Sequence, residues 1–183
     1  MQFTLSYRGE LKANRGAKDK HALRLHFHKQ LQHLWQQQPL SECHGFLDAS
    51  NPYGCVRDVG DQRFLTLVTA QNRTLARLAI TLLRPGSPGQ LFHSGGDIDN
   101  RLKTLLDALR MPVSSQEMPS TLNPNTNPEL IHCLLEDDKL IESISVTTDR
   151  FLEPIVSQSE VLVLIHVTTR SMNSAELWQM ISG

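Results

Sequence analysis

Two spacings of apolar residues alternate along this chain, and together they limit the folds that it can adopt. Between about residues 19 and 38, Leu23, Phe27, Leu31 and Trp35 recur every three or four positions, which predicts a helix with one buried face. The leucines of residues 100–110 repeat this spacing and predict a second helix. Strands are expected over residues 3–7, 64–69, 75–83, 142–148 and 160–168. This order predicts an α+β fold, in which helices pack on one face of a mixed β-sheet.

Breaker residues separate these segments. Pro39 is expected to stop the first helix, and residues 41–61 are expected to be irregular apart from one short strand. Residues 111–130 are rich in Pro, Ser, Asn and Thr and contain no Lys or Arg, which predicts a flexible insertion, placed at 112–135. A short final helix is expected over 175–181. With 183 residues and no internal repeat, the chain 1–183 is expected to form a single domain.

Composition narrows the setting in which the chain works. The three cysteines are widely spaced and odd in number, which disfavours a disulfide framework or a zinc ribbon and favours a reducing compartment. The first residues are too polar for a signal peptide, and the longest apolar run, 161–165, is too short to cross a bilayer. We therefore expect a cytoplasmic protein without a membrane span. The same run predicts a central or dimer-facing strand, with simple core packing as the alternative.

Positive charge is concentrated near the N-terminus, although the formal net charge of the whole chain is −1. Residues 1–35 contain seven basic side chains, namely Arg8, Lys12, Arg15, Lys18, Lys20, Arg24 and Lys29. A local basic stripe of this kind can bind phosphate groups while the remaining surface is acidic. A solvated charged face is the alternative interpretation. On the first helix His26 and His28 diverge by about 200°, so they are not expected to share an ion.

Two acidic segments carry the strongest chemical signal. Asp97 and Asp99 stand at the start of the second predicted helix, Lys103 follows one turn later, and the pair Asp137 and Asp138 precedes a predicted strand. Mg²⁺ takes oxygen ligands, often one or two carboxylates together with water and phosphate oxygens. If the fold brings the two segments together, their mutual repulsion calls for a cation. These residues therefore predict a magnesium site for phosphodiester chemistry.

Each of these residues also has a structural interpretation. Aspartate is favoured at helix N-termini, so Asp97 or Asp99 alone could serve as a cap. Lys103 could pair with Asp107 on the helix surface, an interaction worth a few tenths of a kcal/mol. Acidic pairs at the end of a loop usually face solvent. Asn100 could belong to the first helical turn or orient a neighbouring carboxylate.

The pattern Asp97-x-Asp99-Asn100-x-x-Lys103, followed by Asp137-Asp138 before a strand, resembles the RusA-type Holliday-junction resolvases. The resemblance is strongest over about 94–150. It implies a RusA-like fold and a homodimeric, Mg²⁺-dependent endonuclease that cuts four-way DNA junctions by paired nicks. By this match Asp97, Asp99 and Asp138 are the metal-binding carboxylates, Lys103 is the catalytic lysine, and Asn100 and Asp137 support them. Mn²⁺ is the expected substitute metal.

The resemblance and the charge pattern together give one functional hypothesis and two alternatives. One or two Mg²⁺ ions would activate water and clamp the scissile phosphate, while Lys103 neutralises developing negative charge. The residues expected to follow the DNA backbone are Lys12, Arg15, Lys18, Lys20 and Arg24. The first alternative is a nuclease for other branched, flapped or single-stranded DNA. The second is a catalytically inactive DNA-binding or protein-interaction module.

Overall fold

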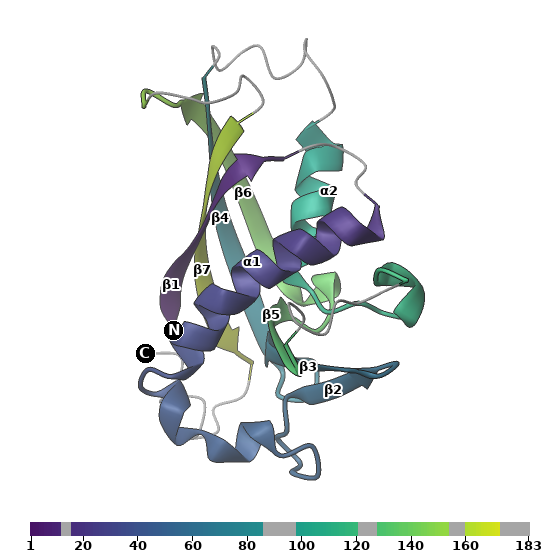
Figure 1. Ribbon diagram of the computed structural model, residues 1–183. Coiled ribbons are helices and arrows are strands. Elements are labelled where there is room, and N and C mark those ends of the chain that lie inside the picture. The colour runs from purple at the N-terminus through teal and green to yellow at the C-terminus, as the bar shows by residue number, and fades with distance from the viewer. Residues whose placement is uncertain (12–15, 86–97, 121–127, 154–159, 173–183) are drawn as a thin grey trace.

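The structure is a computed structural model that describes residues 1–11, 16–85, 98–120, 128–153 and 160–172. Its main sheet has four strands in the order β1-β7-β4-β6 (Figure 1). These strands are β1 (Gln2–Glu10), β4 (Thr74–Arg84), β6 (Ile141–Arg150) and β7 (Glu160–Ser171). β7 pairs antiparallel with both β1 and β4, whereas β4 and β6 are parallel. The sheet is therefore mixed.

β7 lies between β1 and β4, and its apolar residues alternate along the strand. Val161, Val163, Ile165 and Val167 are all buried, and the residues between them are more exposed. This alternation places one face of the strand on the core. The strand predicted over 160–168 is confirmed and extends to Ser171, and its apolar run 161–165 lies in a central strand of the sheet.

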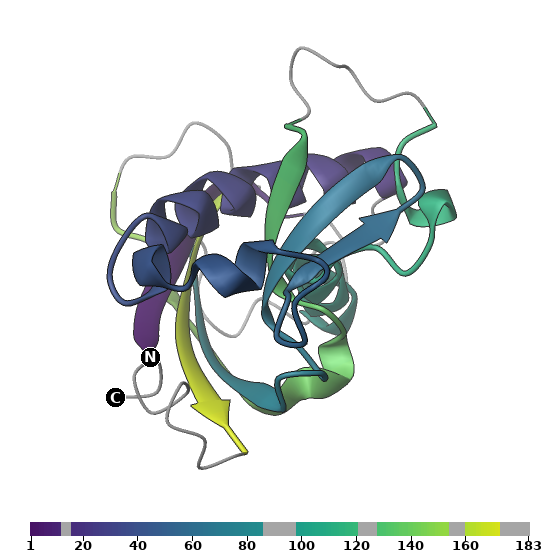
Figure 2. The same cartoon turned by 90° about the horizontal axis from the view of Figure 1, so that it is seen from below.

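A second sheet contains three strands in the order β2-β3-β5, and Figure 2 shows it beside the first. β2 (Val56–Val59) is antiparallel to β3 (Gln62–Val68), which runs parallel to β5 (Leu130–Leu135). β3 and β4 follow one another in the chain but lie in different sheets, so they do not form a hairpin. The expected α+β class is confirmed, with two sheets in place of the one expected.

The helices α1 (Ala17–Trp35) and α2 (Ile98–Leu109) pack against one another and against β5, and α1 also contacts β1 (Figures 1 and 2). α1 buries the predicted stripe Leu23, Phe27, Leu31 and Trp35. It ends before Pro39, after which short 3₁₀ segments η1 (Leu40–Glu42) and η2 (His44–Leu47) lead to β2. Residues of both sheets and both helices join one hydrophobic core.

The predicted insertion at 112–135 is wrong for its last part, because residues 130–135 form the buried strand β5. Its first part includes the 3₁₀ segment η4 (Ser115–Glu117), and Met118 packs with Phe64 and Ile131 over the second sheet. This segment therefore covers a sheet face. The helix expected over 175–181 lies outside the described residues. In the part of the chain that is described, no helix combines the length and apolar character needed to cross a bilayer.

Candidate functional site

A groove of about 460 Å³ separates α2 from the beginning of β6. Its lining residues are Leu106, Asp138, Lys139, Ile141, Glu142, Ser143 and Ile144. The two walls are held together where α2 and β5 end, because Arg110 and Leu135 form a parallel β-bridge and the Met111 N–H donates to the Leu135 carbonyl at 2.9 Å. The acidic pair 137–138 follows β5 directly and is thereby placed beside α2.

Asp137 and Asp138 lie at the 3₁₀ segment η5 (Asp138–Leu140), which leads into β6. The Asp137 carboxylate accepts the Lys139 N–H at 3.0 Å and forms an ion pair with the Lys139 ammonium at 3.0 Å. Desolvation raises the pKa of Asp137, but the hydrogen bonds from Lys139 outweigh it, so that the pKa is lowered overall. Asp138 lines the groove together with Lys139 and Glu142.

The α2 wall of the groove carries the predicted lysine. Asp99, Lys103 and Leu106 are separated by four and three residues, so they lie on one face of the helix. Asp99 and Lys103 are exposed, and the Asn100 carbonyl accepts the Thr104 hydroxyl at 3.0 Å within the helix. Lys103 is one turn from Leu106, which lines the groove together with Asp138. Lys103 itself is not among the residues that line the groove.

The three carboxylates predicted to bind metal are not seen at one point. Asp97 lies outside the described residues. Asp99 precedes Leu106 by seven residues, about 10 Å along the helix axis, and it does not line the groove that contains Asp138. Among the described residues there is no group of three or more His, Cys, Asp or Glu side chains that could hold a metal ion. The described carboxylates that line the groove are Asp138 and Glu142, and Asp137 precedes Asp138 in the chain.

The expected basic stripe is divided between surface and interior. Lys12 and Arg15 lie outside the described residues, and Lys18 is exposed. Arg24 needs a correction, because it is 2% exposed and cannot follow a DNA backbone at the surface. Its Nε donates to the Arg110 carbonyl at 3.0 Å and its Nη2 to the Asp107 carbonyl at 2.9 Å. These bonds satisfy carbonyls at the C-terminal end of α2, where a cation is also favoured by the helix dipole.

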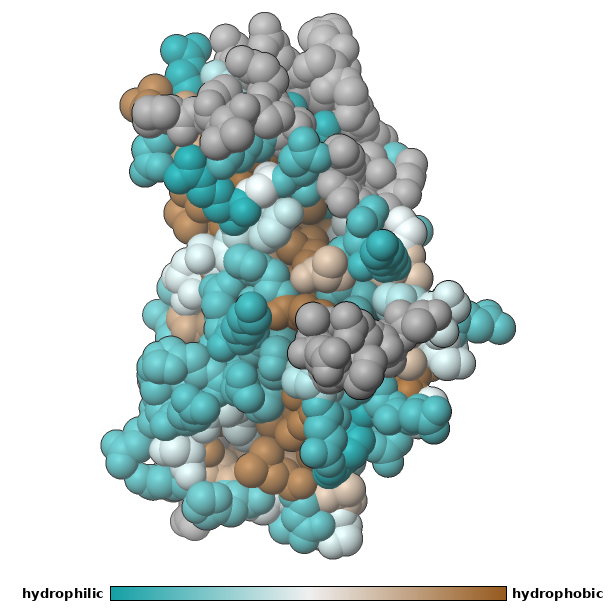
Figure 3. Space-filling view, in the orientation of Figure 1, coloured by the Kyte–Doolittle hydropathy of each residue, from teal (hydrophilic) through white to brown (hydrophobic). Residues whose placement is uncertain are grey.

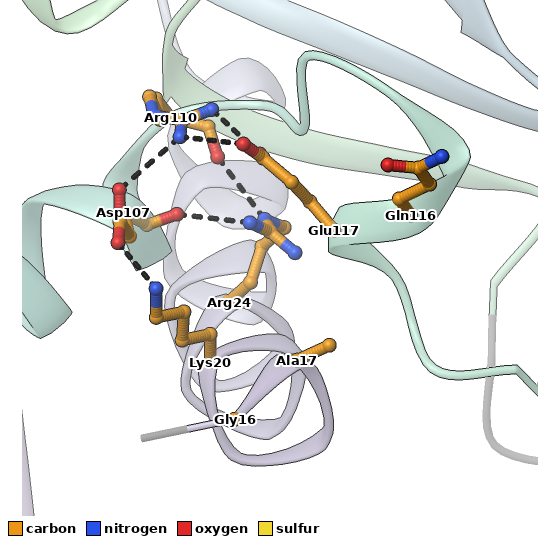
Figure 4. A pocket seen from close by; sticks show the side chains of 8 residues that line it. All are labelled: Gly16, Ala17, Lys20, Arg24, Asp107, Arg110, Gln116 and Glu117. Carbon is orange, nitrogen blue, oxygen red and sulfur yellow. Dashed lines mark hydrogen bonds and ion pairs between the residues drawn. The ribbon is translucent and has the colours of Figure 1, made fainter. Parts of the chain in front are cut away.

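Lys20 belongs to an ion-pair network beside Arg24 (Figure 4). Its ammonium lies 2.6 Å from Asp107 Oδ2, while Asp107 Oδ1 is 3.2 Å from Arg110. Arg110 also binds Glu117 at 2.9 Å, and this hydrogen bond is the main reason that the pKa of Glu117 is lowered. The network surrounds a cavity of about 300 Å³ and ties α1 to α2 and η4. Asp107 therefore pairs with Lys20 and Arg110, in place of the alternative pairing with Lys103.

Sequence reasoning missed a buried pair of histidines. His28 Nδ1 accepts the His132 N–H at 3.0 Å, and their rings are 5.2 Å apart. Burial lowers the pKa of both, that of His132 to about 4. Both side chains are thus held neutral inside the fold. The signal available in the sequence was the spacing of His21, Arg24, His28 and Leu31, which continues the buried stripe of α1.

Thiol chemistry has no support from the cysteines. All three are free, and burial raises the pKa of each, to about 12 for Cys55 and Cys133. Cys43 donates its S–H to the Pro39 carbonyl. A raised pKa reduces the thiolate fraction on which nucleophilic attack depends.

In Figure 3 hydrophilic residues cover most of the α1 face, broken by small apolar areas.

Comparison with known proteins found no matching family model, no matching curated protein and no matching solved structure. The resemblance to RusA-type resolvases therefore remains a prediction from the sequence.

Proposed function

We propose that this protein is a metal-dependent endonuclease that cuts four-way DNA junctions by paired nicks. The observation that carries the proposal is the position of Asp138 in a groove whose α2 side is lined by Leu106, one turn from Lys103. Paired carboxyl oxygens suit a hard divalent ion, which commonly binds few protein ligands and keeps several waters. The motif shared with RusA-type resolvases supplies the choice of substrate.

The chain's own residues divide the work in this proposal. Asp138 and Asp137 would hold Mg²⁺ or Mn²⁺, with Asp97 and Asp99 as the further carboxylates that the resemblance implies. The ion, when bound, would lower the pKa of a coordinated water and draw charge from the phosphate. Lys103 would place its ammonium beside the phosphate oxygens as negative charge grows on them. Asn100 would orient the Asp99 carboxylate.

DNA would be held by the cations that remain available at the start of α1. Lys18 is exposed there, and Lys12 and Arg15 precede it in the chain. Contacts of this kind position the DNA backbone without reading its sequence. A homodimer would suit a junction with approximate twofold symmetry, because each copy could cut one of two equivalent strands. Three free cysteines agree with a cytoplasmic setting for this activity.

The test is a cleavage assay with labelled four-way junction, flap, single-stranded and linear duplex DNA, in Mg²⁺, in Mn²⁺ and in EDTA. We expect cutting of the junction in either metal and none in EDTA. Cutting of the other DNA forms would favour the first alternative, a nuclease for other branched, flapped or single-stranded DNA, over a junction-specific enzyme. Binding without cutting in both metals would overturn the nuclease proposal in favour of a non-catalytic DNA-binding module.

A matched pair of aspartate variants assigns the chemistry to the groove. Asp138→Asn should abolish cutting and leave junction binding unchanged or tighter, because it removes a negative charge near the DNA. Asp149→Asn is the control, since Asp149 is an exposed carboxylate further along the same strand, β6. Wild-type cutting by Asp138→Asn would remove Asp138 from the site.

A further inference from the structure

β6 is an edge strand with an open side. Among the described strands it pairs only with β4, on one of its two sides. Nine of its ten residues pair with β4 in a parallel ladder, and nearly the whole strand is exposed. An edge of this kind presents unpaired N–H and C=O groups that can bind another strand.

The inner face of β6 continues the apolar core of the sheet but is left uncovered. Ile144 is in register with Leu78 of β4, and Val146 is in register with Ile80. Leu78 and Ile80 are 2% and 1% exposed, whereas Ile144 and Val146 are 39% and 37% exposed. The apolar layer of the sheet therefore ends in two large side chains that face solvent next to the open edge.

β6 also lacks the features that usually protect an edge. Residues 143–148 carry no charge and include neither proline nor glycine. Natural sheets commonly place lysine, proline or a bulge at such positions to prevent strand addition. The single register shift in the β4–β6 ladder lies at its beginning, between Ala76 and Arg77. The centre of the strand is therefore open to pairing.

We propose that β6 is the surface through which two copies of this chain associate, with the two β6 strands antiparallel about a twofold axis at Ser145. The sequence around Ser145 reads alike in both directions, because Ile144 and Val146 flank it and Ser143 and Thr147 lie beyond them. Antiparallel pairing about Ser145 sets Ile144 of each copy opposite Val146 of the other. An isologous interface requires a strand that is complementary to itself. Pairing with a strand of an unrelated protein would not require this symmetry.

This pairing would bury what is now exposed on each copy. The apolar side chains of Ile144 and Val146 would form cross-strand pairs, the unit that stabilises a sheet. No like charges would meet in the centre, because the nearest charged residues, Glu142 and Asp149, fall opposite Thr148 and Ile141 of the other copy. Glu142 is moreover neutralised by Arg77 at 2.6 Å and Arg170 at 2.8 Å on its own copy. The two four-stranded sheets would join into one.

The dimer would also fix the separation of the two candidate sites. Ile141 is four residues from Ser145, so the two copies of Ile141 would lie about 26 Å apart along the joined strands, and each Asp138 would lie beyond its Ile141. The relevance of this spacing to DNA cutting rests on the proposed function. Self-association is measured without DNA, so the two ideas can fail separately.

Light scattering after size-exclusion chromatography tests the association. We expect a mass near twice the 20.6 kDa of the chain for the unmodified protein. Val146→Lys should give the monomer mass, because it places a cation at the centre of the pairing. Val113→Lys is the matched control, since Val113 is 70% exposed and lies outside β6; it should remain dimeric. Circular dichroism verifies that both variants fold.

Cysteine crosslinking tests the register. Residues that face each other across a twofold axis lie about 4.5–5.5 Å apart at Cα, within reach of a disulfide. Ser145→Cys should therefore crosslink to a covalent dimer under mild oxidation. Ser143→Cys, two residues along the same face, should not, because its own copy would be about 13 Å away. Wild-type protein controls for its three native thiols.

Each outcome bears on one proposal. An unmodified chain that is monomeric at high micromolar concentration overturns the β6 dimer, and β6 would then be open to a strand of another protein. A dimer that survives Val146→Lys, or that fails to crosslink at Ser145→Cys, overturns this surface. A dimer that crosslinks as expected but cuts no DNA leaves the surface standing and overturns only the nuclease.

Discussion

Arg110 and Leu135 meet in a single parallel β-bridge, which joins the end of α2 to the end of β5. The helix that carries Lys103 is thereby fixed to the strand that leads into Asp137 and Asp138. Two segments more than thirty residues apart in the chain thus form opposite walls of one groove. Rigid elements of this kind hold side chains more accurately than loops.

Replacing Lys103 tests whether the α2 wall takes part in cutting. Lys103→Ala should lower the rate of junction cleavage by about 100- to 1,000-fold, because a positioned cation acts where charge develops. Single-turnover cleavage at saturating protein measures this rate. Lys29→Ala is the control, since Lys29 is an exposed lysine of α1. A loss below tenfold would assign Lys103 to the solvated surface.

The ion-pair network around Asp107 should stabilise the fold. Asp107→Asn removes the charge that Lys20 and Arg110 share, and it should lower the free energy of unfolding by about 2–4 kcal/mol. Urea unfolding followed by circular dichroism gives the value. The exposed Asp149→Asn variant should change stability by less than about 0.5 kcal/mol. Equal effects of the two variants would show that the network contributes little.

Lys18 and Arg24 should separate DNA binding from folding, although both lie in the expected basic stripe. Lys18→Ala should weaken DNA binding and lower the slope of log affinity against log salt by about 1, with unchanged stability. Arg24→Ala should destabilise the protein by about 3 kcal/mol, because it leaves two buried carbonyls without a donor. Salt titrations and urea unfolding measure the two effects. A salt slope unchanged in Lys18→Ala would move the DNA surface elsewhere.

The buried histidines should make stability depend on pH. The pKa of His132 is depressed to about 4 in the folded chain, so the unfolded chain binds the proton first as pH falls below the ordinary value of about 6.5. The stability associated with neutral His132 is therefore present above that value and is lost progressively between about pH 6.5 and pH 4. His132→Gln should flatten the pH dependence of the unfolding free energy in that window.

His44→Gln is the control for this experiment, because His44 is exposed. It should leave the pH dependence as in the unmodified protein. An unchanged slope in His132→Gln would show that His132 is already protonated, or solvated, in the folded state. His28 faces the same cluster and its pKa is also lowered by burial, so a smaller slope should remain in the His132 variant.

The elements with strong apolar periodicity could be predicted, and those defined by partners could not. The stripe of α1 and the alternation of β7 are visible in the sequence, since each depends on local spacing alone. β5 was missed because its apolar residues are buried on both faces, so that they do not alternate. The separation of β3 and β4 into two sheets depends on β5 and β7, which come much later in the chain.

The residues of the candidate site show the same difference between local and distant signals. The acidic pair and Lys103 were identified from residue type and spacing; of the three residues Asp138 lines the groove, and Lys103 lies one turn from Leu106 on its α2 side. Arg24 was assigned to the surface because arginine is rarely buried without partners. Its partners are carbonyls of Asp107 and Arg110, more than eighty residues away in the chain. The local sequence around Arg24 does not predict these contacts.

β7 lies between β1 and β4, so β1, the first strand of the chain, can join the sheet only after β7, the last described strand, has been made. Gln2 pairs with Thr168, so the main sheet stays divided until residues 160–171 have left the ribosome. Products that stop before residue 160 would expose the facing edges of β1 and β4, and such edges promote aggregation. Incomplete chains should therefore accumulate as insoluble material, and the main sheet should form only after residues 160–171 have been synthesised.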